Sequence, residues 1–232
     1  MPPLSLPDLA ALAFFAFAWT IYHMSIERGV GDRTGLNHLM DGYRRRWMQE
    51  MSERDSRIVD SAIMGSLQNG TAFFASTSLI AIGGVATLLR TTDDVLRIFS
   101  EISLGLVPDR GLFELKVIGL LVIFGYAFFK FAWAYRLFNY TAILIGATPA
   151  RANPDTAERA RMVRRAGAMN IVAGTHFTRG QRAFFFALAY LGWFLGPWTF
   201  LAATASVLYV MGKRQFGSDA KRALQEADEK PA

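Results

Sequence analysis

The twenty residues from Gly70 to Leu89 read GTAFFASTSLIAIGGVATLL and contain no charged side chain. A helix rises about 1.5 Å per residue and the hydrocarbon core of a bilayer is about 30 Å thick, so about 20 apolar residues make one crossing. The stretch is therefore predicted to be a transmembrane helix. Its small residues, among them Gly83 and Gly84, would let a neighbouring helix approach its backbone closely.

Three further apolar stretches lie outside this one, at residues 9–26, 112–133 and 183–211. The first has no Lys or Arg before it, which argues against a cleaved signal peptide and for a retained crossing. Together the stretches predict an all-α membrane protein with a single four-helix transmembrane domain over residues 1–215. The polar remainder, residues 216–232, is expected to be disordered.

The fourth stretch is the longest and contains Gly192, Gly196 and Pro197. We expect one long helix there, kinked at the proline, with a Gly-x-x-x-Gly spacing that suits close helix crossing. A break over Gly174–Gly180 should separate it from an Ala- and Arg-rich helix in the preceding loop.

Amphipathic helices are expected in the loops. Residues 40–62 place Met and aromatic side chains near helical spacing with arginines on the other face, as in helices that lie in the membrane interface. Thr91-Thr92-Asp93-Asp94 is a typical helix start, because Thr caps amides and acids favour the first turn.

Composition narrows the chemistry. The chain has no cysteine, which excludes disulfides, thiolate metal sites and covalent c-type haem. The net charge of +6 favours anionic lipid headgroups as partners, and no nucleic-acid-binding motif is present. No cofactor is predicted, and bound phospholipid is expected.

Arginine predicts the orientation, since loops rich in Lys and Arg stay on the cytoplasmic side. Loops 27–69 and 147–182 carry seven arginines each, whereas loop 90–111 carries three and the N-terminus none. We therefore expect a multi-pass protein of a bacterial inner membrane with these two loops cytoplasmic and both termini periplasmic. The five Lys and Arg of the C-terminal tail disagree with this orientation.

Several strings resemble one family of small membrane proteins. They are Arg57-Ile-Val-Asp60, Phe73-Phe-Ala-Ser-Thr-Ser-Leu-Ile-Ala-Ile-Gly-Gly84, Phe131-Ala-Trp-Ala-Tyr-Arg-Leu-Phe-Asn-Tyr140, and His176-Phe with Gln181-Arg-Ala-Phe-Phe-Phe-Ala-Leu-Ala189. In this order they are similar to the domain-of-unknown-function family 599. The resemblance covers about residues 10–215 and implies a multi-spanning membrane protein, with no reaction attached.

His23 lies near the inner end of the first predicted span and is a candidate haem or metal ligand. The other two histidines, His38 and His176, fall in loops, and no His-x-x-x-His pairing exists. A b-type haem usually needs a second axial ligand. We therefore predict no metal site and expect His23 to hydrogen-bond a neighbouring helix.

Polar residues gather at the predicted cytoplasmic ends of the second, third and fourth spans: Asp60, Gln68, Asn69, Arg136, Asn139, His176, Arg179 and Arg182. Polar groups at this depth are costly unless paired. The interpretation we favour is structural, an Asp60–Arg ion pair that ties the loops to the bundle. The functional alternative is an anionic ligand or lipid headgroup held by Arg136, Arg179 and Arg182.

No catalytic motif appears, neither Gly-x-Ser-x-Gly nor a phosphate-cradling loop. The leading hypothesis is a non-enzymatic structural or accessory subunit that self-associates or joins a larger membrane complex. An oligomeric transporter or channel component is the alternative. A lipid-acting membrane enzyme is a weaker one.

Overall fold

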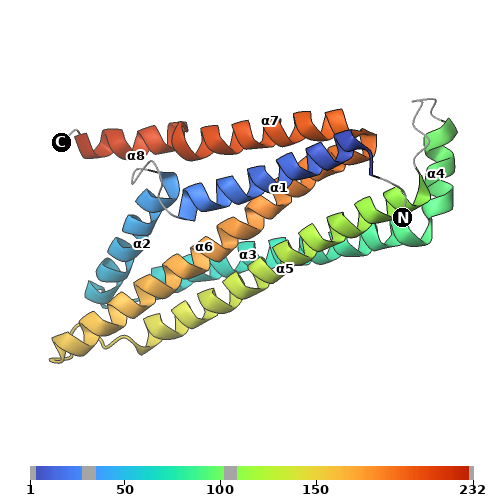
Figure 1. Cartoon of the computed structure of the whole chain (residues 1–232). Helices are drawn as coiled ribbons and strands as arrows, with labels where there is room; N and C mark the ends of the chain where they lie inside the picture. Colours follow the sequence, from blue (N-terminus) through green and yellow to red (C-terminus); the bar gives the residue numbers. More distant parts are fainter. Residues whose placement is uncertain (1–3, 28–34, 102–108, 230–232) are drawn as a thin grey trace. The chain divides into compact units, whose positions relative to one another are not determined.

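The computed structural model describes residues 4–27, 35–101 and 109–229, and every regular element in these ranges is an α-helix. Figure 1 labels them: α1 (Leu6–Glu27), α2 (Leu36–Glu53), α3 (Ile58–Arg90), α4 (Thr92–Glu101), α5 (Arg110–Ala147), α6 (Thr156–Leu195), α7 (Pro197–Phe216) and α8 (Asp219–Glu229). The all-α prediction is confirmed. Arg28, Arg33 and Lys230, which entered the charge count, lie outside the described residues.

Three described helices are long and apolar enough to cross a membrane: Leu6–Met24, Ile58–Arg90 and Arg110–Ala147. The helices concerned, α1, α3 and α5, contain the first three stretches singled out from the sequence. α3 has 33 residues and α5 has 38, about 50 and 57 Å of helix at 1.5 Å per residue. Both exceed the roughly 30 Å of hydrocarbon in a bilayer.

The fourth stretch differs from the prediction of one kinked helix over residues 183–211. α6 ends at Leu195 and α7 begins at Pro197, with Gly196 between them at φ 133°. That backbone angle is accessible to glycine and disfavoured for side-chain-bearing residues. Proline then suits the first helical position, where an amide has no intrahelical partner. A turn replaces the expected kink.

The turn folds α7 back against α6. A Cβ placed on Gly192 would lie 3.1 Å from the Ala203 Cβ and 3.1 Å from the Thr199 carbonyl oxygen. The Trp193 ring stacks on Phe200, with centroids 5.6 Å apart. The glycine spacing does permit a close helix approach, and the partner is the next helix of the same chain.

The break expected over residues 174–180 is also absent, since α6 continues through it. The hydroxyls of Thr175 and Thr178 donate to the carbonyls four residues earlier, at 3.0 and 2.9 Å. Gly174 lies under the Arg44 guanidinium and Gly180 under the Phe131 ring, each with no room for a Cβ. These glycines serve close packing, so the helix does not stop at them.

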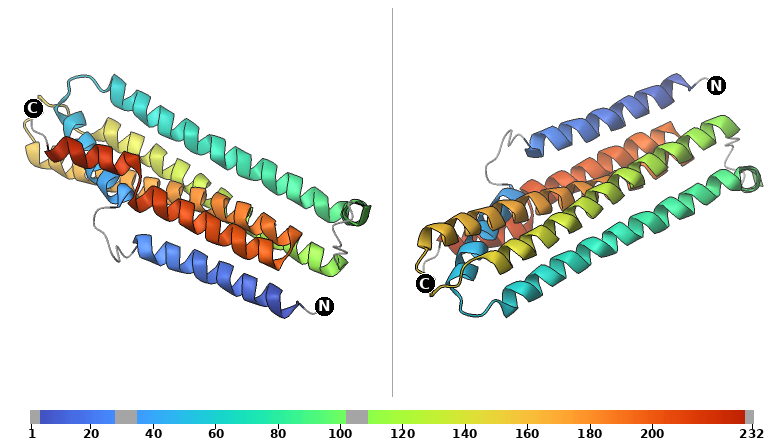
Figure 2. Two further views of the ribbon diagram at one scale, coloured as in Figure 1. Left: turned by 90° about the horizontal axis from the view of Figure 1, so that it is seen from above. Right: turned by 90° about the horizontal axis from the view of Figure 1, so that it is seen from below.

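The described helices form two compact units. Unit 1 contains α1, α4, α7 and residues 78–90, 110–127 and 182–195 of the three longest helices, α3, α5 and α6. These segments can be found in Figure 2 by the residue numbers of its colour bar. Unit 2 contains α2, α8 and residues 58–77, 128–147 and 156–181 of the same helices. α8 includes residues of the tail for which we expected disorder.

Within unit 1 the helix directions follow from two hydrogen bonds. Near the end of α1, the Tyr22 hydroxyl donates to the Met211 carbonyl near the end of α7, at 3.3 Å. At the opposite end, Trp193 Nε1 near the end of α6 donates to Asp8 at the start of α1, at 2.7 Å. α1 and α7 therefore run in one direction and α6 in the other. Phe15 packs between them against Phe186 and Phe200.

Unit 2 has its own apolar core. Its buried members come from α2, α3, α5 and α6: Met48, Met51, Met64, Ala134, Leu137, Phe138, Ile145, Val163, Ala166 and Ala173. Met48 and Met51 are 0% exposed. We expected this side of α2 to lie among acyl chains, and the structure instead buries it against protein. Fully buried methionines fill irregular gaps between helices.

Gly196→Ala should lower stability, because the new Cβ is incompatible with a φ of 133°. We expect a loss of about 1–3 kcal/mol in the apparent free energy of unfolding, measured by denaturant titration in detergent micelles. Gly212→Ala is the matched control, since this helical glycine has open space around it. It should raise stability by up to about 1 kcal/mol. Equal effects of the two changes would contradict a required glycine at the turn.

Candidate functional site

Asp60, in the first turn of α3, holds α2 to α3 within unit 2. Its carboxylate is 0% exposed, and Oδ1 accepts hydrogen bonds from Trp47 Nε1 at 2.7 Å and Arg54 Nη1 at 2.6 Å. The Asp60–Arg54 pair is an ion pair of the kind expected from the sequence. A carboxylate also suits the positive end of a helix dipole. These contacts give Asp60 a structural role.

Arg57 binds the end of α5, a contact that the sequence analysis missed. Its Nη1 donates to the carbonyls of Ile145 and Thr148, both at 2.7 Å, and its Nη2 donates to the Pro149 carbonyl at 3.0 Å. The last carbonyls of a helix have no intrahelical donor and attract cations. Arg57 thus caps α5. The one sign of this in the sequence was that Arg57 begins Arg57-Ile-Val-Asp60, one of the strings that carry the family resemblance.

A second missed contact joins α2 to α6. Arg44 Nη1 donates to the backbone carbonyl of Asn170, at 3.3 Å, and to its side-chain oxygen. Burial lowers the pKa of Arg44, while the neighbouring Asp41 opposes that shift. Burial raises the pKa of Asp41, against the opposing charges of Arg44, Arg45 and His38. The arginine run at 44–46 therefore contains one residue that is built into the fold.

Gln68 and Asn139 do meet, as their equal predicted depth suggested. Gln68 Nε2 donates to Asn139 Oδ1 at 2.7 Å and links α3 to α5 within unit 2. Such amide pairs satisfy polar groups between otherwise apolar helices. Asn139 is therefore held by a partner within the protein.

Arg136 lies on an exposed aromatic surface of unit 2. Its Nε donates to the Tyr140 hydroxyl at 2.6 Å, and its guanidinium carbon lies 5.9 Å from the Trp133 ring centroid and 5.5 Å from that of Tyr140. On its other side Trp133 contacts His176 of α6 edge-on, with centroids 6.4 Å apart. The structure thus brings two predicted site residues, Arg136 and His176, to one aromatic surface.

The two remaining arginines of the predicted cluster are distributed differently. Arg179 is half-buried on α6, three residues after His176 in unit 2. Arg182 belongs to unit 1, is 8% exposed, and acts electrostatically on Tyr22. Of the eight predicted polar residues, the structure pairs Gln68 with Asn139 and brings Arg136 and His176 to the Trp133 ring.

Unit 1 contains a buried charged network that sequence reasoning also missed. Trp193 accepts a hydrogen bond at its carbonyl from Lys116 Nζ, at 2.7 Å, and donates its Nε1 to Asp8. Ser5 donates to the second oxygen of Asp8. Asp8 is 5% and Lys116 7% exposed. This network joins the starts of α1 and α5 to the end of α6.

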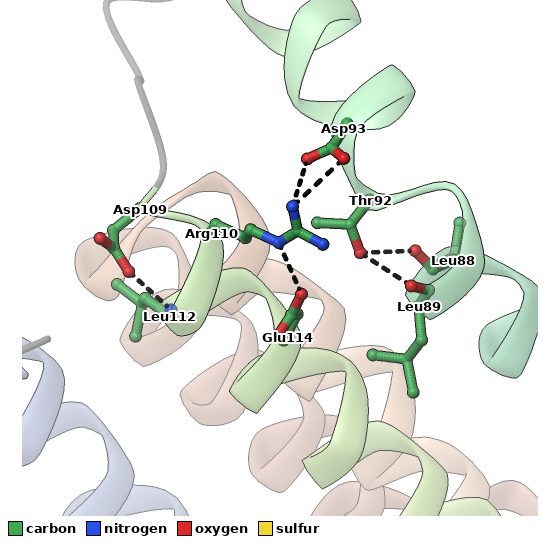
Figure 3. Close-up of polar contacts among 8 residues, drawn as sticks. All are labelled: Leu88, Leu89, Thr92, Asp93, Asp109, Arg110, Leu112 and Glu114. Carbon is green, nitrogen blue, oxygen red and sulfur yellow. Dashed lines mark hydrogen bonds and ion pairs between the residues drawn. The ribbon is translucent and has the colours of Figure 1, made fainter. Parts of the chain in front are cut away.

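The junction of α4 and α5 lies in the same unit and is solvent-exposed (Figure 3). Arg110 Nη1 donates to both oxygens of Asp93, at 2.9 and 3.2 Å, and its Nε donates to Glu114 at 3.0 Å. Asp109 caps α5 by accepting the Leu112 amide at 3.0 Å. Exposed ion pairs of this kind add little stability, and they orient the helix ends.

The glycines of α3 face open space. A Cβ on Gly83 or Gly84 would meet nothing within 4 Å. For metals, the described ranges hold no group of three or more His, Asp or Glu side chains that could bind an ion. His23 lies on α1 within the helix, as its position in the first apolar stretch predicted.

The family model described as "Protein of unknown function, DUF599" matches residues 10–220 of the chain. No curated protein and no solved structure matches the chain. The match covers both compact units, including Arg57, Asp60 and Arg136.

Asp8→Asn should destabilise unit 1, because it leaves Lys116 buried without its nearby negative charge. Removing one partner of a buried charged pair costs on the order of 3 kcal/mol. Adding Lys116→Met to Asp8→Asn should restore part of the loss, and denaturant titration of the four variants gives the coupling energy. Asp94→Asn, an exposed acid on α4, is the control. A coupling energy near zero would show that Asp8 and Lys116 act independently.

Proposed function

This chain belongs to the DUF599 family of proteins of unknown function, and we propose that it is an integral membrane protein that acts as a non-enzymatic accessory subunit. In this proposal it joins copies of itself or a larger membrane complex. The observation that carries it is the exposure of α3. Only 6% of the most apolar 18-residue stretch of this helix is buried within the protein.

The exposed surface of α3 is unusual in its small residues. Phe73, Ile80 and Leu79 are 66%, 76% and 52% exposed. Between and beyond them lie Ser76, Gly83, Gly84 and Thr87, all exposed. Lipid tails are as apolar as leucine, so helices in a membrane associate through close backbone packing. An exposed small-residue surface supports α3 as the helix that meets a partner.

We further propose five membrane crossings, by α1, α3, α5, α6 and α7. The turn at Gly196 supports this number, because α6 and α7 run in opposite directions within unit 1. α6 and α7 are less apolar than the three helices above, and they pack against α1, which is one of those three. An odd number of crossings separates the termini.

The five-crossing topology places the Lys- and Arg-rich loops and the Lys- and Arg-rich tail on the same side of the membrane. With the N-terminus outside, loops 27–69 and 147–182 and the C-terminal tail all lie on the cytoplasmic side. The tail carries Lys213, Arg214, Lys221, Arg222 and Lys230. Under the positive-inside rule these five charges now agree with the fourteen arginines of the two loops. Four crossings left them in conflict.

The topology can be tested by cysteine labelling, because the chain has no cysteine of its own. Asp94→Cys on α4 should react with a membrane-impermeant maleimide in intact bacterial cells. Ala220→Cys on α8 and Arg161→Cys on α6 should react only after the inner membrane is permeabilised. All three positions are exposed. Labelling of Ala220→Cys in intact cells would restore the topology with both termini outside.

Gly84→Leu should weaken association while the isolated chain stays folded, because no described residue lies within 4 Å of a Cβ at this position. We expect the larger species on native gels or in crosslinking to fall about tenfold or more, with an unchanged unfolding midpoint. Loss of close backbone packing is the reason. Gly125→Leu on α5, which also has open space around it, is the matched control. An equal or absent effect of both changes would contradict the α3 contact.

A further inference from the structure

Arg136 interrupts an otherwise apolar stripe on α5. Leu115, Val122, Phe129, Arg136 and Ile143 recur every seven residues and therefore share one face of the helix. The four apolar members are 44%, 66%, 71% and 65% exposed. Arg136 is exposed as well. A stripe of this composition faces lipid, so its one cation requires an explanation.

The parts of α3, α5 and α6 around Arg136 supply no acid that could neutralise it. The sequence contains no Asp or Glu over residues 61–90 of α3, 115–147 of α5 and 159–195 of α6. Asp60, in the first turn of α3, is already bound to Arg54 and Trp47. An arginine at the edge of a bilayer reaches the layer of lipid phosphates, and anionic lipids attract it. Its counter-charge therefore comes from outside these helices.

The position of Arg136 along α5 matches a layer of phospholipid phosphates. Lys116 lies near the start of α5, where it binds the Trp193 carbonyl, and Arg136 lies twenty positions further along the same helix. That is about 30 Å of helix, the thickness of one hydrocarbon core. Trp133 and Tyr140 are 45% and 36% exposed. Tryptophan and tyrosine concentrate at this level of a membrane.

The geometry prepares Arg136 for a phosphate. Tyr140 takes the Nε hydrogen bond and, with Trp133, holds the guanidinium against two aromatic rings. The two terminal amino groups then form a fork of the kind that binds phosphate oxygens in pairs. We propose that Arg136, on its Trp133–Tyr140 platform and flanked by His176, binds the phosphodiester of an anionic phospholipid in the cytoplasmic leaflet.

This inference rests on the proposed membrane location, and its test separates the two. Full-length protein in detergent is titrated with phosphatidylglycerol or with phosphatidylcholine of the same acyl chains, and bound lipid is counted by native mass spectrometry. The wild type should bind the first phosphatidylglycerol about tenfold more tightly than phosphatidylcholine, because the choline ammonium of phosphatidylcholine competes with Arg136 for the same phosphodiester. Arg136→Gln should remove this preference.

Arg165→Gln is the control, because it removes the same charge from an exposed position on α6. It should keep the preference, since general attraction to anionic lipid depends on total charge. Arg136→Lys keeps the charge without the fork and should give an intermediate preference, which covers the case that Arg136→Gln unfolds. Tyr140→Phe should also weaken the preference, because it releases the Nε contact.

Several outcomes would overturn the proposal. One is a wild type without lipid preference, and another is an equal loss in Arg136→Gln and Arg165→Gln. Competition by millimolar glycerol phosphate or inorganic phosphate would identify a site for free anions in place of lipid. Carbonate extraction of the expressed protein is run in parallel. Release from membranes there would contradict the proposed function itself, whereas retention with no lipid preference would contradict this site alone.

Discussion

The length of α3, α5 and α6 is the constraint from which the other contacts follow. Each of these helices has at least 33 residues, so each is about 50 Å long or more. A helix that exceeds the hydrocarbon core carries polar residues and a terminus beyond it, and these need partners. Unit 2 supplies them. Arg57 caps α5, Asp60 binds Arg54, and Gln68 binds Asn139.

Unit 2 also has an apolar core of its own. Residues of α3, α5 and α6 in this unit bury apolar side chains against one another. α2 completes this core with Met48 and Met51, both inaccessible to solvent. An arginine-rich helix that composition assigned to the membrane interface is therefore part of a packed protein unit. Hydrophobic spacing assigned the apolar side of this helix to acyl chains, whereas the structure buries Met48 and Met51 against protein.

Hydropathy predicted the three helices that are long and apolar enough to cross a membrane, because a long uncharged stretch has few other stable structures. It failed at Gly196 because an apolar turn between two apolar helices leaves hydropathy unchanged. It also failed at Gly174 and Gly180. Glycine both ends helices and permits close packing, and the choice depends on neighbours far along the chain. Here those neighbours are Arg44 and Phe131.

The arginines show why the candidate site was only partly predictable. Counting them predicts topology, since every arginine in a short loop adds to the same bias. Their individual roles differ, and each depends on the acceptor that the fold brings near. Arg54 meets a carboxylate, Arg57 meets helix carbonyls, and Arg44 meets an asparagine.

Arg136 meets two aromatic rings and the hydroxyl of Tyr140, and none of these neutralises its charge. Arg136 is therefore held in place by neutral groups. Such a cation is suited to an anionic partner outside the chain. The contacts of Arg44, Arg54 and Arg57 lie within the fold. For Arg136 the structure adds a reason to look for a ligand.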